Sequence, residues 1–81
     1  MNLYPNPVDG VLNVSMDLNT EEDLVYTVLD MQGRVIKQVR ASLAQGRNIL
    51  EIDTQDMQQG QYIFLVNSTE GVMTKRFIVQ H

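Results

Sequence analysis

The segment LVYTVLDMQGRVIKQVR, residues 24–40, decides the fold class of this chain. Residues 24–30 alternate with apolar side chains on both faces, which is typical of a strand at the centre of a sheet. Asp30-Met31-Gln32-Gly33 then predicts a turn, because Asp suits the first position of a type I turn and Gly supplies the left-handed residue that follows. Since residues 34–40 resume the alternation, the segment predicts a β-hairpin.

Other short apolar runs with a period of two flank this hairpin at intervals of roughly 8 to 12 residues, a spacing typical of a sandwich or barrel. They predict a short edge strand at Leu3-Tyr4 and further strands over residues 11–16, 48–53, 61–67 and 72–79. A helical period persists nowhere, because the one candidate, residues 43–45, is broken by Gly46. We therefore expect seven strands and almost no helix.

The alternation also predicts which side chains form the core. The inward set includes three side chains of residues 11–16 and three of residues 72–79: Leu12, Val14, Met16, Met73, Phe77 and Val79. Their outward neighbours are Asn13, Ser15, Thr74 and Arg76. Met57 is expected to cap the core from a loop, and turns are predicted at Gln45-Gly46 and over residues 68–71.

Length and composition leave room for one domain, residues 1–81, because a chain this short can hold only one hydrophobic core. Cysteine is absent and the one histidine, His81, stands at the end of the chain, which excludes disulfides and a His/Cys cage for structural zinc. Stability must therefore come from packing alone.

The charge balance is acidic, with six Lys and Arg against ten Asp and Glu and a net charge of −4. This charge repels a phosphate backbone, so we expect no nucleic-acid partner. No apolar run approaches the roughly 18 to 20 residues that cross a bilayer, and the first residues lack the layout of a secretory signal. Absence of cysteine fits a reducing cytoplasm and a bacterial surface protein equally, so composition leaves the compartment open.

No pattern of side chains indicates catalysis. A nucleophile needs a positioned base, and we expect His81 to be frayed because it is terminal. The carboxylates of residues 17–23 are interpreted as a solvated acidic loop, because they imply no hydrolytic groove and their spacing matches no calcium loop. Glycine-rich phosphate motifs are absent. We expect no catalytic residue, metal, cofactor or small-molecule substrate.

Two features have more than one explanation. Pro5-Asn6-Pro7 either forms a rigid link to a preceding segment or blocks pairing at a sheet edge. The basic pair Lys75-Arg76 is interpreted first as edge charge that prevents sheet extension. The edge strands at both ends of the chain leave self-association open.

The order of five motifs carries a resemblance. They are Leu3-Tyr4-Pro5-Asn6-Pro7, residues 11–14 (VLNV), residues 28–35 (VLDMQGRV), Gly60-Gln61-Tyr62 and residues 75–79 (KRFIV). Together, from Leu3 to about Val79, they resemble the type A C-terminal sorting domain of the type IX secretion system, also called the Por secretion system, of Bacteroidetes. Each motif alone is weak, whereas their order is specific.

The resemblance implies an immunoglobulin-like, seven-stranded antiparallel β-sandwich that ends a larger cargo protein. It implies that the domain directs cargo through the outer-membrane translocon, after transit through the periplasm, to the outer-membrane surface or the medium. A sortase-like peptidase commonly removes such a domain. The expected partners are therefore the type IX translocon and that peptidase.

By the same resemblance, the recognition-bearing residues would be Gly60, Tyr62, Lys75 and Val79. Pro5, Asn6, Pro7, Asp30 and Gly33 would be mainly structural. The alternative is an immunoglobulin-like adhesion, carbohydrate-binding or spacer module. Sugar binding is disfavoured because Trp is absent and alternation places Tyr4, Tyr26 and Tyr62 mostly inward.

Overall fold

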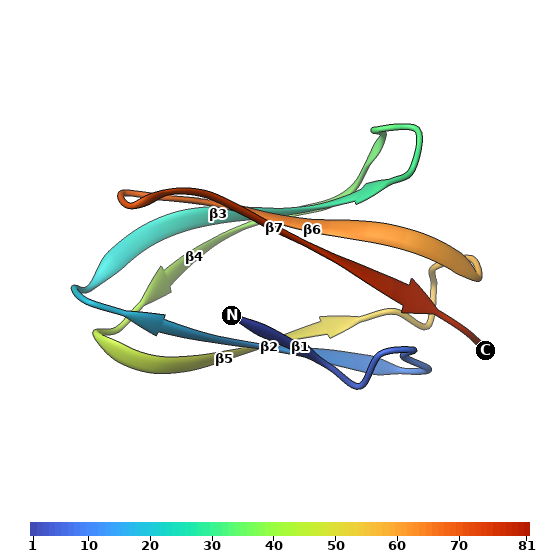
Figure 1. Cartoon of the computed structure of the whole chain (residues 1–81), viewed down its shortest axis with the longest axis horizontal. Coiled ribbons are helices and arrows are strands. Elements are labelled where there is room, and N and C mark those ends of the chain that lie inside the picture. The colour runs from blue at the N-terminus through green and yellow to red at the C-terminus, as the bar shows by residue number, and fades with distance from the viewer.

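Seven strands and no helix make up the computed structural model, which describes all residues, Met1–His81. β1 (Asn2–Tyr4), β2 (Val11–Leu18) and β5 (Gly46–Asp53) form a three-stranded sheet in the order β1-β2-β5. β3 (Glu22–Asp30), β4 (Val35–Leu43), β6 (Gly60–Ser68) and β7 (Gly71–Val79) form a four-stranded sheet in the order β4-β3-β6-β7. The sheets lie face to face as a sandwich (Figure 1). The predicted all-β class is confirmed, and no helix that could cross a bilayer is present.

The sheet order follows from the tight turn between β3 and β4. In the constant-type immunoglobulin sandwich the fourth strand pairs with the fifth, in the sheet of the first two strands. Here the short β3–β4 hairpin keeps β4 beside β3, so β4 joins the four-stranded sheet, and all five pairs of neighbouring strands are antiparallel. The arrangement is consistent with an immunoglobulin-like fold.

The core lies between the sheets, where alternate side chains of both sheets meet. Its fully buried members include Phe64, Phe77, Leu12, Val14 and Val28. The ring of Tyr26 packs on Phe64 and the ring of Tyr62 on Phe77, with centroids 5.6 and 5.7 Å apart. Met57 is buried from its loop, as predicted.

The turn between β4 and β5 is shorter than predicted. We expected strands over residues 34–40 and 48–53, but β4 continues to Leu43 and β5 begins at Gly46. The Asn48 side chain closes the turn, since its Nδ2 donates to the carbonyl oxygens of Ala44 and Gly46 at 2.8 and 3.2 Å. Leu43 is buried as well, so the strand gains core contact by extending.

Three side chains differ from the prediction in their burial. Ser15 is buried although it lies on the outer face, because β2 is the middle strand and Asn2 and Ile49 flank Ser15 on either side. Met73 is 38% exposed because it lies on the edge strand β7 and the opposite sheet has one strand fewer. Tyr4 is 40% exposed because it alternates with Leu3, which packs against the core.

Candidate functional site

The β3–β4 turn is built around one carboxylate. Gly33 has a φ of +86°, and its N–H donates to the Asp30 carbonyl at 3.0 Å, which is the predicted turn. The N–H groups of Gln32 and Arg34 both donate to Asp30 Oδ1 at 2.9 Å, and Arg34 Nε donates to Asp30 Oδ2 at 2.7 Å. The Asp30 side chain therefore holds the whole turn together.

These contacts favour the ionised carboxylate. The pKa of Asp30 is lowered first by the backbone N–H of Arg34 and also by the Arg34 side chain and the N–H of Gln32, against desolvation, which raises it. The Arg34 side chain is 76% exposed, so only its Nε is committed to the turn. Arg34 belongs to the motif quoted above, but the sequence did not predict its contact with Asp30.

Gly60 and Tyr62 begin β6 beside this turn. Gly60 has a φ of +155° and lies opposite Val79, and Tyr62 lies opposite Phe77 on β7 and Asp30 on β3. The Tyr62 hydroxyl donates to the carbonyl oxygen of Gln58 at 2.5 Å. Because the Tyr62 ring is buried, this bond ties the loop between β5 and β6 to the core. A contact to a backbone carbonyl leaves no signal in the sequence.

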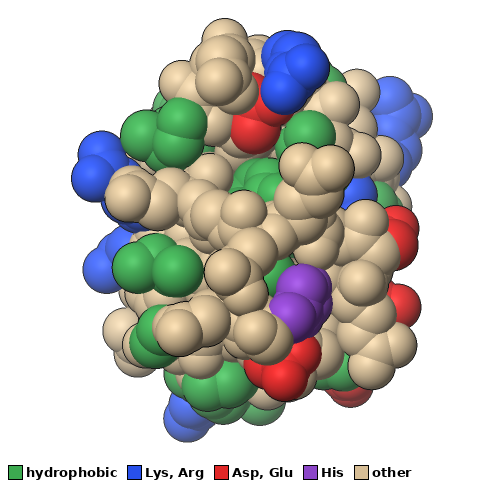
Figure 2. Space-filling model, turned by 90° about the vertical axis from the view of Figure 1, so that its right-hand side faces the viewer, with side chains coloured by type: hydrophobic (Ala, Val, Ile, Leu, Met, Phe, Trp, Pro, Cys, Tyr) green, Lys and Arg blue, Asp and Glu red, His purple; other side chains and the backbone are tan.

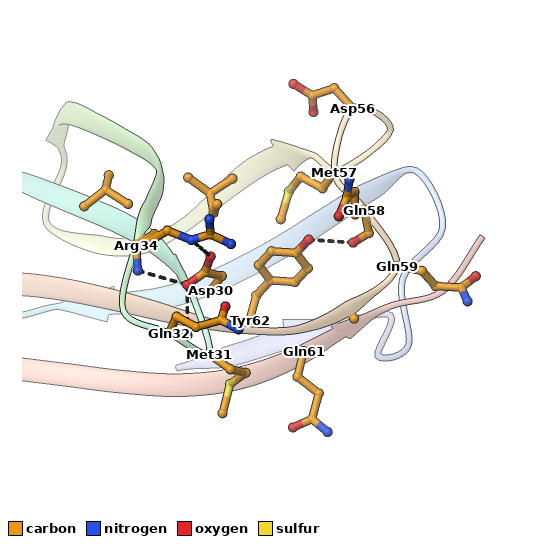
Figure 3. Close-up of a pocket in the computed structure, with 13 residues that line it drawn as sticks. Asp30, Met31, Gln32, Arg34, Asp56, Met57, Gln58, Gln59, Gln61 and Tyr62 are labelled. Atoms are coloured by element: carbon orange, nitrogen blue, oxygen red, sulfur yellow. Dashed lines mark hydrogen bonds and ion pairs between the residues drawn. The ribbon is translucent and has the colours of Figure 1, made fainter.

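A groove of about 580 Å³ lies between the turn and this loop. Tyr62 points across it toward Gln58, while Arg34 folds over Asp30 at its other wall (Figure 3). Four glutamines, Gln32, Gln58, Gln59 and Gln61, contribute amides that can both donate and accept hydrogen bonds. Lys37 Nζ braces the loop by donating to Asp53 O at 2.6 Å and pairing with Asp56 at 3.2 Å. The groove can therefore hold a polar backbone, and its lining contains no Ser, Cys, Lys or His.

The Pro5-Asn6-Pro7 segment caps the last strand. Both prolines follow cis peptide bonds, and Asn6 Oδ1 accepts a hydrogen bond from Ile78 N at 2.9 Å. Val8 then extends the edge of the four-stranded sheet: its N–H donates to Ile78 O at 2.8 Å, and Gln80 N donates to Val8 O at 2.9 Å. Of the two explanations offered above, the contacts support blocking of the edge.

Lys75 and Val79 occupy different environments on β7. Val79 is fully buried, so it can affect recognition only through packing. Lys75 lies opposite Phe64, is exposed and takes part in no ion pair. Lys75 therefore lies outside the groove, two residues along β7 from Phe77.

His81 is held in place, contrary to the expectation that it is frayed. Its Nδ1 lies 2.8 Å from Asp9 Oδ1 and its Nε2 lies 2.9 Å from the carbonyl oxygen of Met57. Both partners accept hydrogen bonds, so the pKa of His81 is raised, first by the side chain of Asp9 and then by Met57 O. The end of the chain is thereby fixed to two loops.

The Pro5–Pro7 segment, the Asp30–Gly33 turn, the loop of residues 54–59 and the end of β7 lie together at one end of the sandwich, which we name the motif end (Figure 1). Viewed from this side, the surface is largely uncharged, with His81 beside an acidic side chain (Figure 2). The acidic residues 17–23 lie at the opposite end, but they do not form the predicted solvated loop: Asp17 belongs to β2, Glu22 and Asp23 begin β3, and Glu22 is buried and accepts a hydrogen bond from Thr69 N at 2.5 Å. No cluster of three or more His, Cys, Asp or Glu side chains able to hold a metal is present.

A family model described as a secretion system C-terminal sorting domain matches residues 2–80. The match covers all seven strands and every part of the motif end except His81. Neither a curated protein nor a solved structure gives a significant match.

Proposed function

This chain belongs to the family of C-terminal sorting domains of the type IX secretion system, and we propose that the secretion machinery recognises it at the motif end. Membership makes the chain a signal for export to the outer-membrane surface or the extracellular space. The family interacts with the type IX machinery and is not an enzyme family. An adhesion, carbohydrate-binding or spacer role is not favoured.

The convergence of distant motifs supports recognition at the motif end. Asp30, Tyr62 and Val79 are separated in the sequence, yet the pairs Asp30–Tyr62 and Gly60–Val79 place them side by side in the four-stranded sheet. The turns and loops at the other end contain none of the motifs that carry the family resemblance. A partner that reads those motifs would therefore approach from the motif end.

The groove supports a polypeptide as the ligand there. Its glutamine amides match the donors and acceptors of an extended backbone, and its walls are fixed by Asp30 and by the Tyr62 hydroxyl. Gly60 faces open space, because nothing lies within 4 Å of a Cβ added there. A partner backbone can approach closely at this glycine.

Lys75 would provide a second contact. It is the one proposed recognition residue whose charged group is exposed and without an ion pair, so it is available to a carboxylate on the partner. Val79 would contribute by keeping the end of β7 packed beside Gly60. We also propose transit through the periplasm and removal of the domain by a sortase-like peptidase.

The test is surface display of a fluorescent passenger that carries an export signal and ends in residues 1–81, in a bacterium with the type IX pathway. Gln58→Arg places a bulky charge in the groove while keeping the backbone carbonyl that Tyr62 contacts. Gln45→Arg is the matched control, because Gln45 is exposed in the β4–β5 turn at the opposite end.

We expect protease-accessible passenger on intact cells to fall with Gln58→Arg and to remain with Gln45→Arg. Equal display of both variants would overturn recognition at the motif end. Display of the unaltered fusion tests the sorting function itself, and the mass of the displayed passenger tests peptidase removal.

A further inference from the structure

The outer face of the four-stranded sheet carries an apolar cluster on its two inner strands although no layer covers it. Leu29 and Ile63 are paired in a row that Val35 continues on β4, Leu65 lies in the next row beside Thr27, and Val25 lies one row further, beside Asn67. We name this surface the outer four-strand face. Val35 is 58% exposed and Val72, at its margin, is 61% exposed. Antiparallel sheets with one solvated face normally place polar side chains there, so this composition needs a reason.

The opposite outer face of the same molecule has the expected polar composition. On β2 and β5 the outward pairs are Val11–Asp53, Asn13–Glu51, Ser15–Ile49 and Asp17–Arg47. That face carries three carboxylates and one arginine. The apolar composition is therefore specific to the four-stranded sheet and is not a general property of the chain.

The charged side chains of the outer four-strand face are mainly basic, whereas those of the opposite outer face are mainly acidic. Arg40 and Arg76 lie at opposite corners, paired across the strands with Val25 and Ile63, and neither forms an ion pair. The one carboxylate of this face, Asp23, lies at its margin and accepts a hydrogen bond from Ser42 Oγ at 2.5 Å. A hollow of about 320 Å³ in this surface lies beside Val25 and Arg40. A partner complementary to this face would have an apolar centre and carboxylates at its rim.

The area of this face is in the range expected for a transient complex. Four strands about 4.8 Å apart and three rows about 6.7 Å apart give an area of roughly 300 to 400 Å². Both partners together would bury about twice that, which is in the range of weak and transient complexes. A second copy of this chain would offer only one carboxylate, Asp23, against the two arginines, and that carboxylate already accepts a hydrogen bond from Ser42, so self-association by this face is disfavoured.

We propose that the outer four-strand face docks transiently on a protein of the secretion machinery whose surface has an apolar centre bordered by carboxylates. This rests on the proposed function, because a sorting signal must be bound and then released during export. The docking face adjoins the groove at the motif end and shares Val35 with it, but its two arginines and its other apolar side chains lie outside the groove, so the domain would present two adjoining surfaces to the machinery.

The first test uses the same passenger fusion. Arg40→Glu/Arg76→Glu reverses the rim charge, Arg40→Lys/Arg76→Lys preserves it, and Arg47→Glu makes the matched reversal on the opposite outer face. We expect surface display to fall roughly tenfold with the double Glu variant and to stay near the unaltered level with the other two. Thermal unfolding of the purified domains verifies that the variants fold.

Equal display of all four proteins would overturn the docking face while leaving the sorting function intact, whereas absence of display from the unaltered fusion would overturn the function itself. A photo-reactive p-benzoylphenylalanine at Leu65 gives a second readout. A cross-link to one translocon component that is lost with Arg40→Glu/Arg76→Glu supports the proposal. A cross-link to a second copy, or flotation of the purified domain with phosphatidylglycerol vesicles, would overturn it.

Discussion

Replacing Tyr62 with Phe isolates one hydrogen bond that joins the groove to the core. The Tyr62 ring stacks on Phe77 with centroids 5.7 Å apart, and its hydroxyl donates to Gln58 O at 2.5 Å. Phe keeps the ring, its burial and its stacking, and removes only the hydroxyl. The variant therefore measures how strongly the core holds the β5–β6 loop.

The expected loss is about 1 kcal/mol, because a buried neutral hydrogen bond contributes a net 0.5 to 1.5 kcal/mol on average. Gln58 is exposed, so water can replace the lost donor and the loss should not exceed this range. For a domain of this size, 1 kcal/mol lowers the midpoint of thermal unfolding by about 4 to 8 °C. Calorimetry and urea unfolding of the purified domain measure both quantities.

Tyr26→Phe is the matched control. Tyr26 is equally buried and packs on Phe64 at 5.6 Å, but its hydroxyl donates no hydrogen bond within the protein. We expect its free energy of unfolding to change by less than about 0.5 kcal/mol. Equal destabilisation by the two substitutions, or none from Tyr62→Phe, would refute the role assigned to the Tyr62 hydroxyl.

Three further predictions concern the turn and the end of the chain. Gly33→Ala should lower the free energy of unfolding in urea by about 1 to 2 kcal/mol, because φ is +86° at this residue. An added Cβ meets no neighbour, so this backbone strain is the whole effect, and Gly33→Asn should cost less. Because the pKa of His81 is raised, its stabilisation is present below its ordinary pKa and is lost as pH rises through the raised value, so the stability gap to His81→Gln should close only as pH rises above about 6.5. Because the pKa of Asp30 is lowered, its stabilisation is present above its ordinary pKa and is lost as pH falls through the lowered value; acid titrations should show the gap to Asp30→Asn closing only below about pH 4.

The β3–β4 hairpin could be predicted because every local signal agreed. Alternation placed the two strands, and the Asp30–Gly33 turn has one side chain and one backbone conformation suited to it. The β4–β5 turn was predicted less well, since its length depends on the Asn48 side chain reaching back to Ala44. A contact that a side chain makes with backbone three or four residues away changes strand ends without changing the apolar pattern.

The site was predictable to a similar degree. Asp30 was predicted as a turn residue and Gly60 and Tyr62 were selected by resemblance, and antiparallel pairing brings all three to the same end. The fixed position of His81 was missed, because its partners Asp9 and Met57 O belong to loops whose arrangement only the fold determines. Val79 was selected as a recognition residue by resemblance, and its burial gives it a packing role that resemblance alone does not reveal.

The apolar alternation on both faces of residues 24–30 and 61–67 predicted central strands, and β3 and β6 are indeed the two inner strands of the four-stranded sheet. A strand that is central in its sheet and a strand that is covered on both faces share this pattern, and only the number of layers tells them apart. This chain has two layers, so Leu29, Ile63 and Leu65 are left on an uncovered face. Their packing against the protein's own core cannot explain them, because they point away from it. These half-buried apolar side chains are therefore better explained by a partner than by the stability of the isolated domain.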